Sequence, residues 1–351
     1  MKNIIAFVHT EYHLLLTVNQ VLRLYNDAAA FNVELYIRRG INSKRLNQPH
    51  DFSGLPMTVT YFDEEINTHE PLSDKARAEI KTLLDKNPDV FIFYQEQDVL
   101  MVILAYYFSK RGVDVCLYQD GLKPYNHLQY HSLGLIRADH RQNIWLGKNN
   151  FVVPSWLSPV WSKKYAFLKG ISKVYLTFPE MYDNWNRKHL RKIEFLPLDL
   201  LNPVFKRLFV WDESMLPERE KVIFYMNQPM HDDGRYETGF LRQLENRFPD
   251  NPIYIKLHPL TNNIKTEQYK TLKNVKIISS TLPAELFIMN LKESVILSIN
   301  STSMFLDNPE NRFYYLYRIF EEGIKRLSRW KVKRNPAAHI KVVNSIDEIS
   351  F

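Results

Sequence analysis

Cysteine and glycine are scarce in this sequence, and the motifs that depend on them are absent. The 351 residues include one cysteine, Cys116, and ten glycines. A single cysteine excludes a disulfide within the chain and a thiolate zinc site. Neither G-x-G-x-x-G nor G-x-x-x-x-G-K-S/T occurs, so the dinucleotide-binding and P-loop classes lose their main support. The absence of G-x-S-x-G argues against an α/β-hydrolase nucleophile. His127 and His131 lack a carboxylate partner nearby, so we expect no metal site.

No apolar run is long enough to span a membrane. The longest, residues 99–108, has about half of the ~20 residues that a spanning helix needs. The apolar stretch at residues 4–8 is too short for the core of a signal peptide and is typical of a first β-strand. We therefore expect a cytoplasmic protein, with peripheral attachment to the inner face of the cytoplasmic membrane as an open alternative.

The chain is basic, with a formal net charge of +7. Such a charge favours an acidic partner: a nucleic acid, a nucleotide-linked substrate or an anionic membrane surface. No nucleic-acid-binding motif is recognisable, so we do not expect a nucleic acid partner. Segments 187–192 and 325–334 mix cations with apolar side chains, which suits an anionic membrane. A solvated helix face is the equal alternative for both segments.

Strand-like and helix-like patterns alternate along most of the chain. Such alternation predicts parallel sheets covered by helices, in an α/β protein with two Rossmann-like, doubly wound domains. Proline-rich residues 197–220 contain the expected boundary, so the domains are residues 1–205 and 206–351. Between about residues 122 and 170 the alternation fades, which predicts a long irregular insertion. The expected strands are 3–8, 32–37, 58–62, 89–94, 113–118, 173–178, 193–196, 221–226, 252–256, 275–278 and 295–299.

Two polar segments follow predicted strands and carry chemistry. Tyr118-Gln119-Asp120-Gly121 ends the strand at residues 113–118, and Lys256-Leu257-His258-Pro259 ends the strand at 252–256. Open α/β sheets place their ligand-binding groups at the carboxyl ends of strands. One segment supplies a carboxylate and the other a histidine, from different halves of the chain. The sequence therefore predicts a reaction in a central cleft that the two domains face.

These segments resemble the motifs of a known family. Tyr118-Gln119-Asp120-Gly121 is similar to the acidic–acidic–Gly motif of bacterial sialyltransferases, and Lys256-Leu257-His258-Pro259 to their His-Pro motif. Ser301-Thr302-Ser303, after the strand at 295–299, resembles their paired-hydroxyl motif. The order and approximate spacing fit nearly the whole chain. The most similar groups are the lipooligosaccharide sialyltransferases and the polysialyltransferases.

The resemblance implies a GT-B fold and an inverting, metal-independent transfer from CMP-sialic acid, with no other cofactor. The N-terminal domain would hold the acceptor, and the C-terminal domain would bind the nucleotide sugar. Asp120 would remove the proton from a sugar hydroxyl, which is otherwise a poor nucleophile. His258 would stabilise or protonate the departing phosphate. The resemblance also implies nucleotide or phosphate binding by Lys256, Pro259, Glu285, Ser301, Thr302 and Ser303.

Further candidates lie beside these motifs. Gln119 departs from the family pattern, because an acidic residue is expected at this position, and the change could indicate another donor sugar or altered activity. Gly121 would let the backbone or a substrate approach closely. Tyr12, His13 and Gln228 follow predicted strands and could line the cleft.

Simpler structural roles compete with each of these assignments. Asp120 and Gly121 could form a turn, and His258 before Pro259 could end a strand. Ser301 to Ser303 could cap a helix, Glu285 could favour a helix dipole, and Lys256 could point to solvent.

The predicted function is transfer of sialic acid from CMP-sialic acid to a hydroxyl of a cell-surface glycan such as lipooligosaccharide or capsule. One alternative is a GT-B transferase that uses another nucleotide sugar, such as CMP-Kdo. A second alternative is a catalytically degenerate protein that binds a nucleotide or a glycan, which the substitution at Gln119 keeps open.

Overall fold

The chain folds into two compact units, each built on its own parallel sheet. Unit 1 comprises residues 1–47 and 52–198, and unit 2 comprises residues 48–51 and 199–351. The domain boundary predicted from the sequence lies between residues 205 and 206. The computed structural model describes residues 1–351 apart from 27–30, 39–45, 47–48, 65, 97, 122–123, 126–131, 154–164, 167, 169, 183–191, 199–202, 217–220, 229–233, 260, 322, 324–326 and 328–336, with the side chains of 25–26, 132–139 and 181 also left out.

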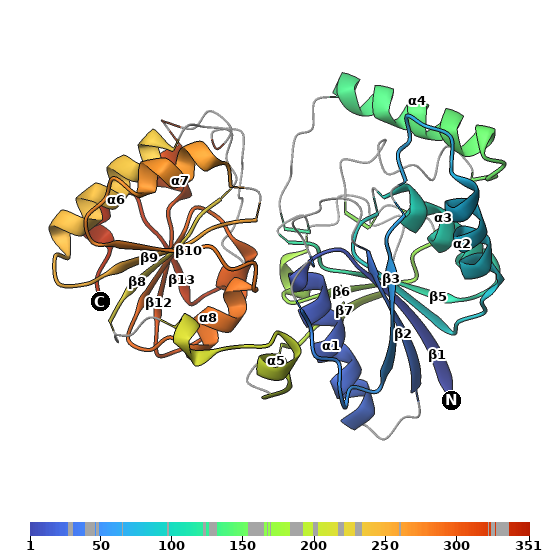
Figure 1. Ribbon diagram of the computed structural model, residues 1–351, viewed down its shortest axis with the longest axis horizontal. Coiled ribbons are helices and arrows are strands. Elements are labelled where there is room, and N and C mark those ends of the chain that lie inside the picture. Colours follow the sequence, from blue (N-terminus) through green and yellow to red (C-terminus); the bar gives the residue numbers. More distant parts are fainter. Residues whose placement is uncertain are drawn as a thin grey trace. The chain divides into compact units, whose positions relative to one another are not determined.

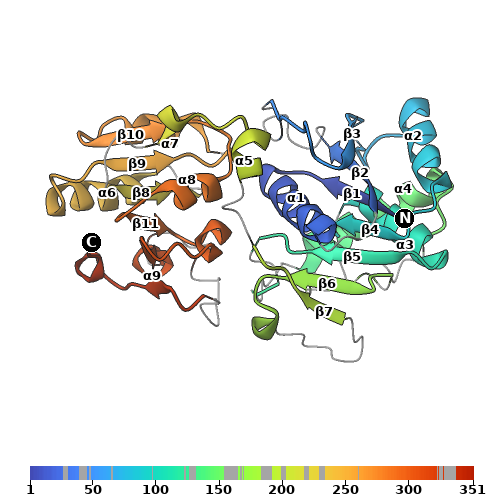
Figure 2. The same cartoon turned by 90° about the horizontal axis from the view of Figure 1, so that it is seen from below.

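Unit 1 contains a seven-stranded sheet with the order β3-β2-β1-β4-β5-β6-β7. All of its strand pairs are parallel, and Figure 2 shows the strands of this unit running side by side. The order reverses between β1 and β4, which makes that edge the topological switch point, where open α/β sheets bind ligands. The strands are β1 (Lys2–Val8), β2 (Phe31–Arg38), β3 (Met57–Phe62), β4 (Val90–Phe93), β5 (Asp114–Tyr118), β6 (Lys173–Leu176) and β7 (Lys192–Phe195).

Capping residues and apolar side chains explain where the helices of unit 1 form. In α2, Ser73 caps the first turn by accepting a hydrogen bond from the amide of Ala76 at 3.1 Å. In α3, Asp98 accepts from the amide of Leu100 at 2.9 Å, and the helix buries apolar residues all round. Such a helix has to lie between other layers of the unit. The unit 1 helices are α1 (Glu11–Asn26), α2 (Asp74–Asp85), α3 (Val99–Lys110) and α4 (Ser132–Lys148).

Helix α4 corrects the prediction of an irregular insertion at 122–170. Its 17 residues include Gly134 and Gly147 and show no strong apolar repeat, so the local signal for a helix is weak. Tertiary contacts supply the missing stabilisation: Trp145 and Leu146 are buried in the unit 1 core, and the indole N–H of Trp145 donates to the carbonyl of Glu70 at 2.7 Å.

Unit 2 contains a six-stranded parallel sheet with the order β10-β9-β8-β11-β12-β13. Figure 1 shows α6 and α7 on one side of this sheet and α8 on the other, which is the doubly wound arrangement. The strands are β8 (Ile223–Met226), β9 (Ile253–Lys256), β10 (Val275–Ile278), β11 (Val295–Ser298), β12 (Arg312–Tyr315) and β13 (Ile340–Val342). The helices are α5 (Pro203–Leu208), α6 (Arg235–Arg247), α7 (Asn263–Tyr269), α8 (Ala284–Asn290) and α9 (Tyr317–Phe320).

The α/β class and the two doubly wound sheets are therefore confirmed. Strands β12 and β13 were not predicted from the sequence. They form by parallel pairing, β12 against β11 and β13 against β12. The central cleft stays a prediction. Most of the basic segments 325–334 and 187–192 lies outside the described residues, which include only Leu327 of the first and Lys192 of the second.

Candidate active site

Asp120 lies in unit 1, just beyond the carboxyl end of β5. Its side chain is 17% exposed, so the carboxylate is accessible to solvent although most of the side chain is packed against the protein. The next residue, Gly121, has a φ of 62°, in the left-handed region that other residues adopt only at a cost. The turn suggested for this Asp-Gly pair is therefore present. It also brings the carboxylate to the sheet edge at which ligands bind.

The carboxylate of Asp120 is paired with a histidine from the first strand–helix junction. His13 Nε2 lies 3.2 Å from Asp120 Oδ1. The other ring nitrogen, Nδ1, accepts a hydrogen bond from the backbone N–H of His9 at 3.4 Å. Since an accepting nitrogen carries no proton, neutral His13 has its proton on Nε2 and donates it to Asp120. The pair resembles the arrangements in which a second side chain orients a catalytic one.

The ring of His13 is itself fixed by packing. It stacks on Tyr94 with ring centroids 4.1 Å apart and an interplanar angle of 8°. The hydroxyl of Tyr94 lies 2.8 Å from Thr17 Oγ1, one helical turn after His13. Both rings are almost fully buried. His13, predicted only as a residue lining the cleft, thus belongs to a rigid support for Asp120.

Behind His13 lies a buried charged cluster that sequence reasoning missed. Arg38 pairs with Asp98, and Asp98 Oδ2 lies 3.9 Å from His9 Nδ1. Burial lowers the pKa of His9 to about 3, although Asp98 opposes the shift, so this imidazole is neutral at physiological pH. The residues lie at the ends of β1 and β2 and before α3. Only the sheet order brings them together.

Gln119 is fully buried and bonded on both sides of its amide. Its Oε1 accepts from the hydroxyl of Tyr125 at 2.6 Å and from the backbone N–H of Thr177 at 2.9 Å. Its Nε2 donates to the hydroxyl of Tyr12 at 3.4 Å. The first position of the motif therefore joins three segments of unit 1. The structure brings Tyr12 and Gln119 together beside Asp120.

In unit 2, Lys256 is buried rather than pointing to solvent. It is 5% exposed, and its ammonium group donates to the carbonyl oxygens of Leu257 at 3.2 Å and Ser280 at 2.5 Å. Burial lowers the pKa of Lys256 to about 8, and the carboxylate of Glu285 opposes the shift. The lysine therefore ties together the loops that follow β9 and β10.

Glu285 and the hydroxyl segment form the next part of this sheet edge. Glu285 lies in the first turn of α8, and burial raises its pKa, although a hydrogen bond from Ser303 opposes the shift. Ser301 caps the 3-10 helix Thr302–Phe305, and its Oγ accepts from the amide of Ser303 at 3.3 Å. The capping role considered for Ser301 is therefore present. Phosphate contact by Ser301, Thr302 and Ser303 stays a prediction.

His258 and Pro259 follow β9 and are partly exposed. The carbonyl oxygen of His258 accepts a hydrogen bond from the amide of Thr261 at 2.8 Å, which closes a turn around Pro259. Gln228, after β8, is also partly exposed, and its carbonyl oxygen accepts from Lys265 Nζ at 3.3 Å. All of these residues lie at the carboxyl edge of the unit 2 sheet.

Asn300 is a further candidate that sequence reasoning missed. It directly precedes Ser301, is 4% exposed, and neither amide atom has a hydrogen-bond partner in the part of the chain that the structure describes. A buried amide without partners costs free energy, which a bound ligand can recover. No local pattern distinguishes this asparagine from a loop residue. Only its burial does.

Metal-ligand clusters and membrane-spanning helices are both absent from the described residues. They contain no group of three or more His, Cys, Asp or Glu side chains placed to hold a metal ion. Within the same residues, no helix combines the length and the apolar character needed to cross a bilayer.

Comparisons with solved structures define the fold. The fold is similar to the GT-B domain of a Photobacterium damselae sialyltransferase, with a TM-score of 0.53, 11% identity, and coverage of 97% of this chain and 99% of that one. A 2,6-sialyltransferase from a Photobacterium species, in complex with CMP and lactose, gives a TM-score of 0.54 at 10% identity, covering 97% and 78%. The UDP-GlcNAc 2-epimerase of Neisseria meningitidis gives 0.50 at 13% identity, covering 87% and 79%. These likenesses establish a GT-B fold.

The sequence defines the family. The profile of the alpha-2,8-polysialyltransferase family matches residues 14–309, and the chain belongs to this family. It is therefore a glycosyltransferase of the sialyltransferase class, as the three motifs predicted. No curated protein sequence matches the chain significantly.

Proposed function

We propose that this protein is an inverting, metal-independent transferase that moves sialic acid from CMP-sialic acid to a hydroxyl of a cell-surface glycan, such as lipooligosaccharide or capsule. Family membership supports sialyl transfer, and the 2,6-sialyltransferase of the same fold that was solved with CMP supports a CMP-linked donor. The net charge of +7 suits the anionic nucleotide sugar and an anionic membrane that carries the acceptor.

The pairing of His13 with Asp120 is the observation that carries this proposal. A sugar hydroxyl needs a base to remove its proton as the new bond forms. Asp120 is accessible and negatively charged when ionised, and the Nε2–H of His13 holds one of its oxygens in place. This contact fixes the orientation of the whole carboxylate, as a general base requires.

Unit 2 supplies the proposed nucleotide site. We assign His258 to the departing phosphate, which gains negative charge as the glycosidic bond breaks. Ser301, Thr302 and Ser303 bring hydroxyl groups to the same sheet edge, and Glu285 and Lys256 hold the neighbouring loops. Pro259 shapes the turn that presents His258.

The test is a CMP-release assay over a panel of donors and galactose-terminated acceptors. We expect release from CMP-sialic acid that depends on the acceptor and survives EDTA. Release only from CMP-Kdo would establish the alternative donor. A product ladder, resolved by size, would show polymerisation rather than single transfer.

Asp120→Asn tests the base directly. We expect transfer to fall by about a thousandfold or more, within the range of general-base catalysis, while CMP binding is retained. Asp114→Asn is the matched control, because Asp114 lies at the opposite end of the same strand and pairs with Lys173 on a partly exposed surface. CMP binding without turnover in the wild-type protein would instead indicate the degenerate binding protein.

A further inference from the structure

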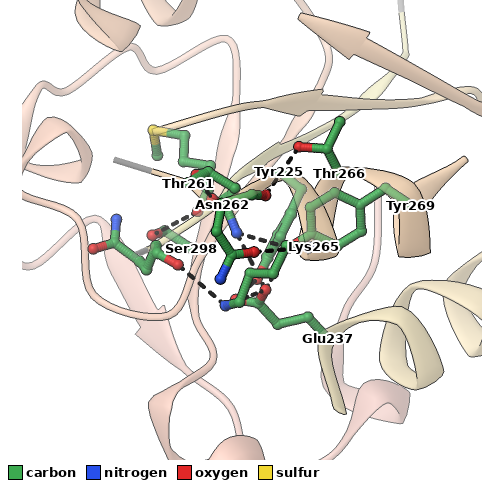
Figure 3. Close-up of polar contacts among 11 residues, drawn as sticks. Tyr225, Glu237, Thr261, Asn262, Lys265, Thr266, Tyr269 and Ser298 are labelled. Atoms are coloured by element: carbon green, nitrogen blue, oxygen red, sulfur yellow. Dashed lines mark hydrogen bonds and ion pairs between the residues drawn. The ribbon is translucent and has the colours of Figure 1, made fainter. Parts of the chain in front are cut away.

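A network of buried polar side chains lies in unit 2, beside the loop that carries His258. It joins the end of β8 to α6 and α7, and Figure 3 shows Glu237 and Lys265 at its centre. Glu237 is 0% exposed and Lys265 is 1% exposed at the side chain. The members are Tyr225, Asn227, Glu237, Lys265 and Tyr269.

The carboxylate of Glu237 collects four donors. Its Oε1 accepts from the hydroxyl of Tyr225 at 2.9 Å. Its Oε2 accepts from Lys265 Nζ at 3.0 Å, from Asn227 Nδ2 at 3.1 Å and from the hydroxyl of Tyr269. A buried ion pair contributes little net stability compared with apolar side chains of the same volume, so its value often lies in specifying one arrangement. Here the network specifies the orientation of the Asn227 side-chain amide.

Asn227 holds both ends of the loop that carries His258. Its backbone N–H donates to the carbonyl of Lys256 at 3.1 Å, just before the loop. Its side-chain Oδ1 accepts from the hydroxyl of Thr261, at the end of the loop. Its Nδ2 donates to Glu237 and, at 2.7 Å, to the hydroxyl of Tyr269. The amide is therefore oriented with its nitrogen toward the network and its oxygen toward Thr261.

We propose that Asn227, oriented by the Glu237–Lys265 pair, is a positioning residue that clamps Lys256 and Thr261 on either side of His258 and thereby sets the place of His258. Thr261 completes the clamp, since its amide also bonds the carbonyl of His258 at 2.8 Å. The inference rests on the proposed role of His258 at the donor phosphate. A displacement of about 1 Å in a catalytic group can lower a rate by about a hundredfold, so the clamp controls kcat.

Thr261→Val removes the clamping hydroxyl with little change in volume, and Thr261→Ser keeps the hydroxyl as the matched control. We expect kcat for transfer to fall by about tenfold to a hundredfold in Thr261→Val, with KM for the donor little changed, and to stay within about threefold in Thr261→Ser. The His258 ring resonance, recorded with ring-labelled histidine and assigned with His258→Gln, should shift or broaden in Thr261→Val and not in Thr261→Ser.

The two readouts separate the inference from the proposed function. If the wild-type protein transfers no sialic acid, the proposed function fails, while the resonance still tests the clamp. An unchanged His258 resonance in Thr261→Val would overturn the clamp, whatever happens to kcat. The double variant Glu237→Gln with Lys265→Met tests the network: a folded variant with kcat lowered about tenfold supports it, and an unchanged kcat would remove the ion pair from the proposal.

Discussion

Replacing Gln119 with leucine should destabilise unit 1, because this amide is a structural junction. Leucine has a similar volume but cannot accept a hydrogen bond. The substitution leaves two buried donors without their acceptor: the hydroxyl of Tyr125, now at 2.6 Å from Oε1, and the backbone N–H of Thr177, at 2.9 Å. The hydroxyl of Tyr12 also loses its contact with Nε2 at 3.4 Å.

The loss of stability follows from the two buried donors that no longer have an acceptor. Each buried group that loses its partner costs about 1–3 kcal/mol, so the loss of two should lower the free energy of unfolding by roughly 2–6 kcal/mol. Gln119→Glu is the matched control. A carboxylate keeps both accepting contacts, and the hydroxyl of Tyr12 can turn to donate to the second oxygen. We therefore expect the glutamate variant, which restores the acidic residue of the family motif, to lose less stability than the leucine variant.

Urea unfolding followed by circular dichroism measures the loss, and hydrogen exchange of the peptide that contains Thr177 locates it. The Thr177 amide should exchange faster in Gln119→Leu than in the wild-type protein. An unchanged urea midpoint in the leucine variant would refute the reasoning. So would a glutamate variant that is the less stable of the two.

Two further predictions concern single side chains in each unit. His13→Phe keeps an aromatic ring on Tyr94 but removes the donor to Asp120, so kcat should fall by about tenfold or more while CMP affinity, measured by calorimetry, is retained; equal loss of both would contradict the assignment. The pKa of Lys256 is lowered by burial from 10.5 to about 8, so between these values the unfolded chain holds a proton that the folded protein has released. Stability must then rise with pH in this window, and the free energy of unfolding of the wild-type protein relative to Lys256→Met should increase by roughly 3 kcal/mol from pH 7 to 10.5. A difference that does not change with pH in urea titrations would show that Lys256 keeps its proton.

Local patterns in the sequence determined most of the strands and the family. The apolar runs at residues 4–8 and 295–297 form buried strands, and Ser73 caps a helix through an amide three residues away. The motifs at Asp120 and His258 were recognisable for the same reason, since each is a short polar segment directly after a strand. Interactions between residues that are close in the chain can be recognised from the sequence.

Only the tertiary structure decided what these segments contact. His13 and Asp120 are 107 positions apart, and they meet because the sheet order places β1 near β5. The burial of Lys256, the bonds of Gln119 and the clamp by Asn227 likewise depend on which strands become neighbours. Strand order minimises the free energy of a whole unit, so no single stretch of sequence encodes it.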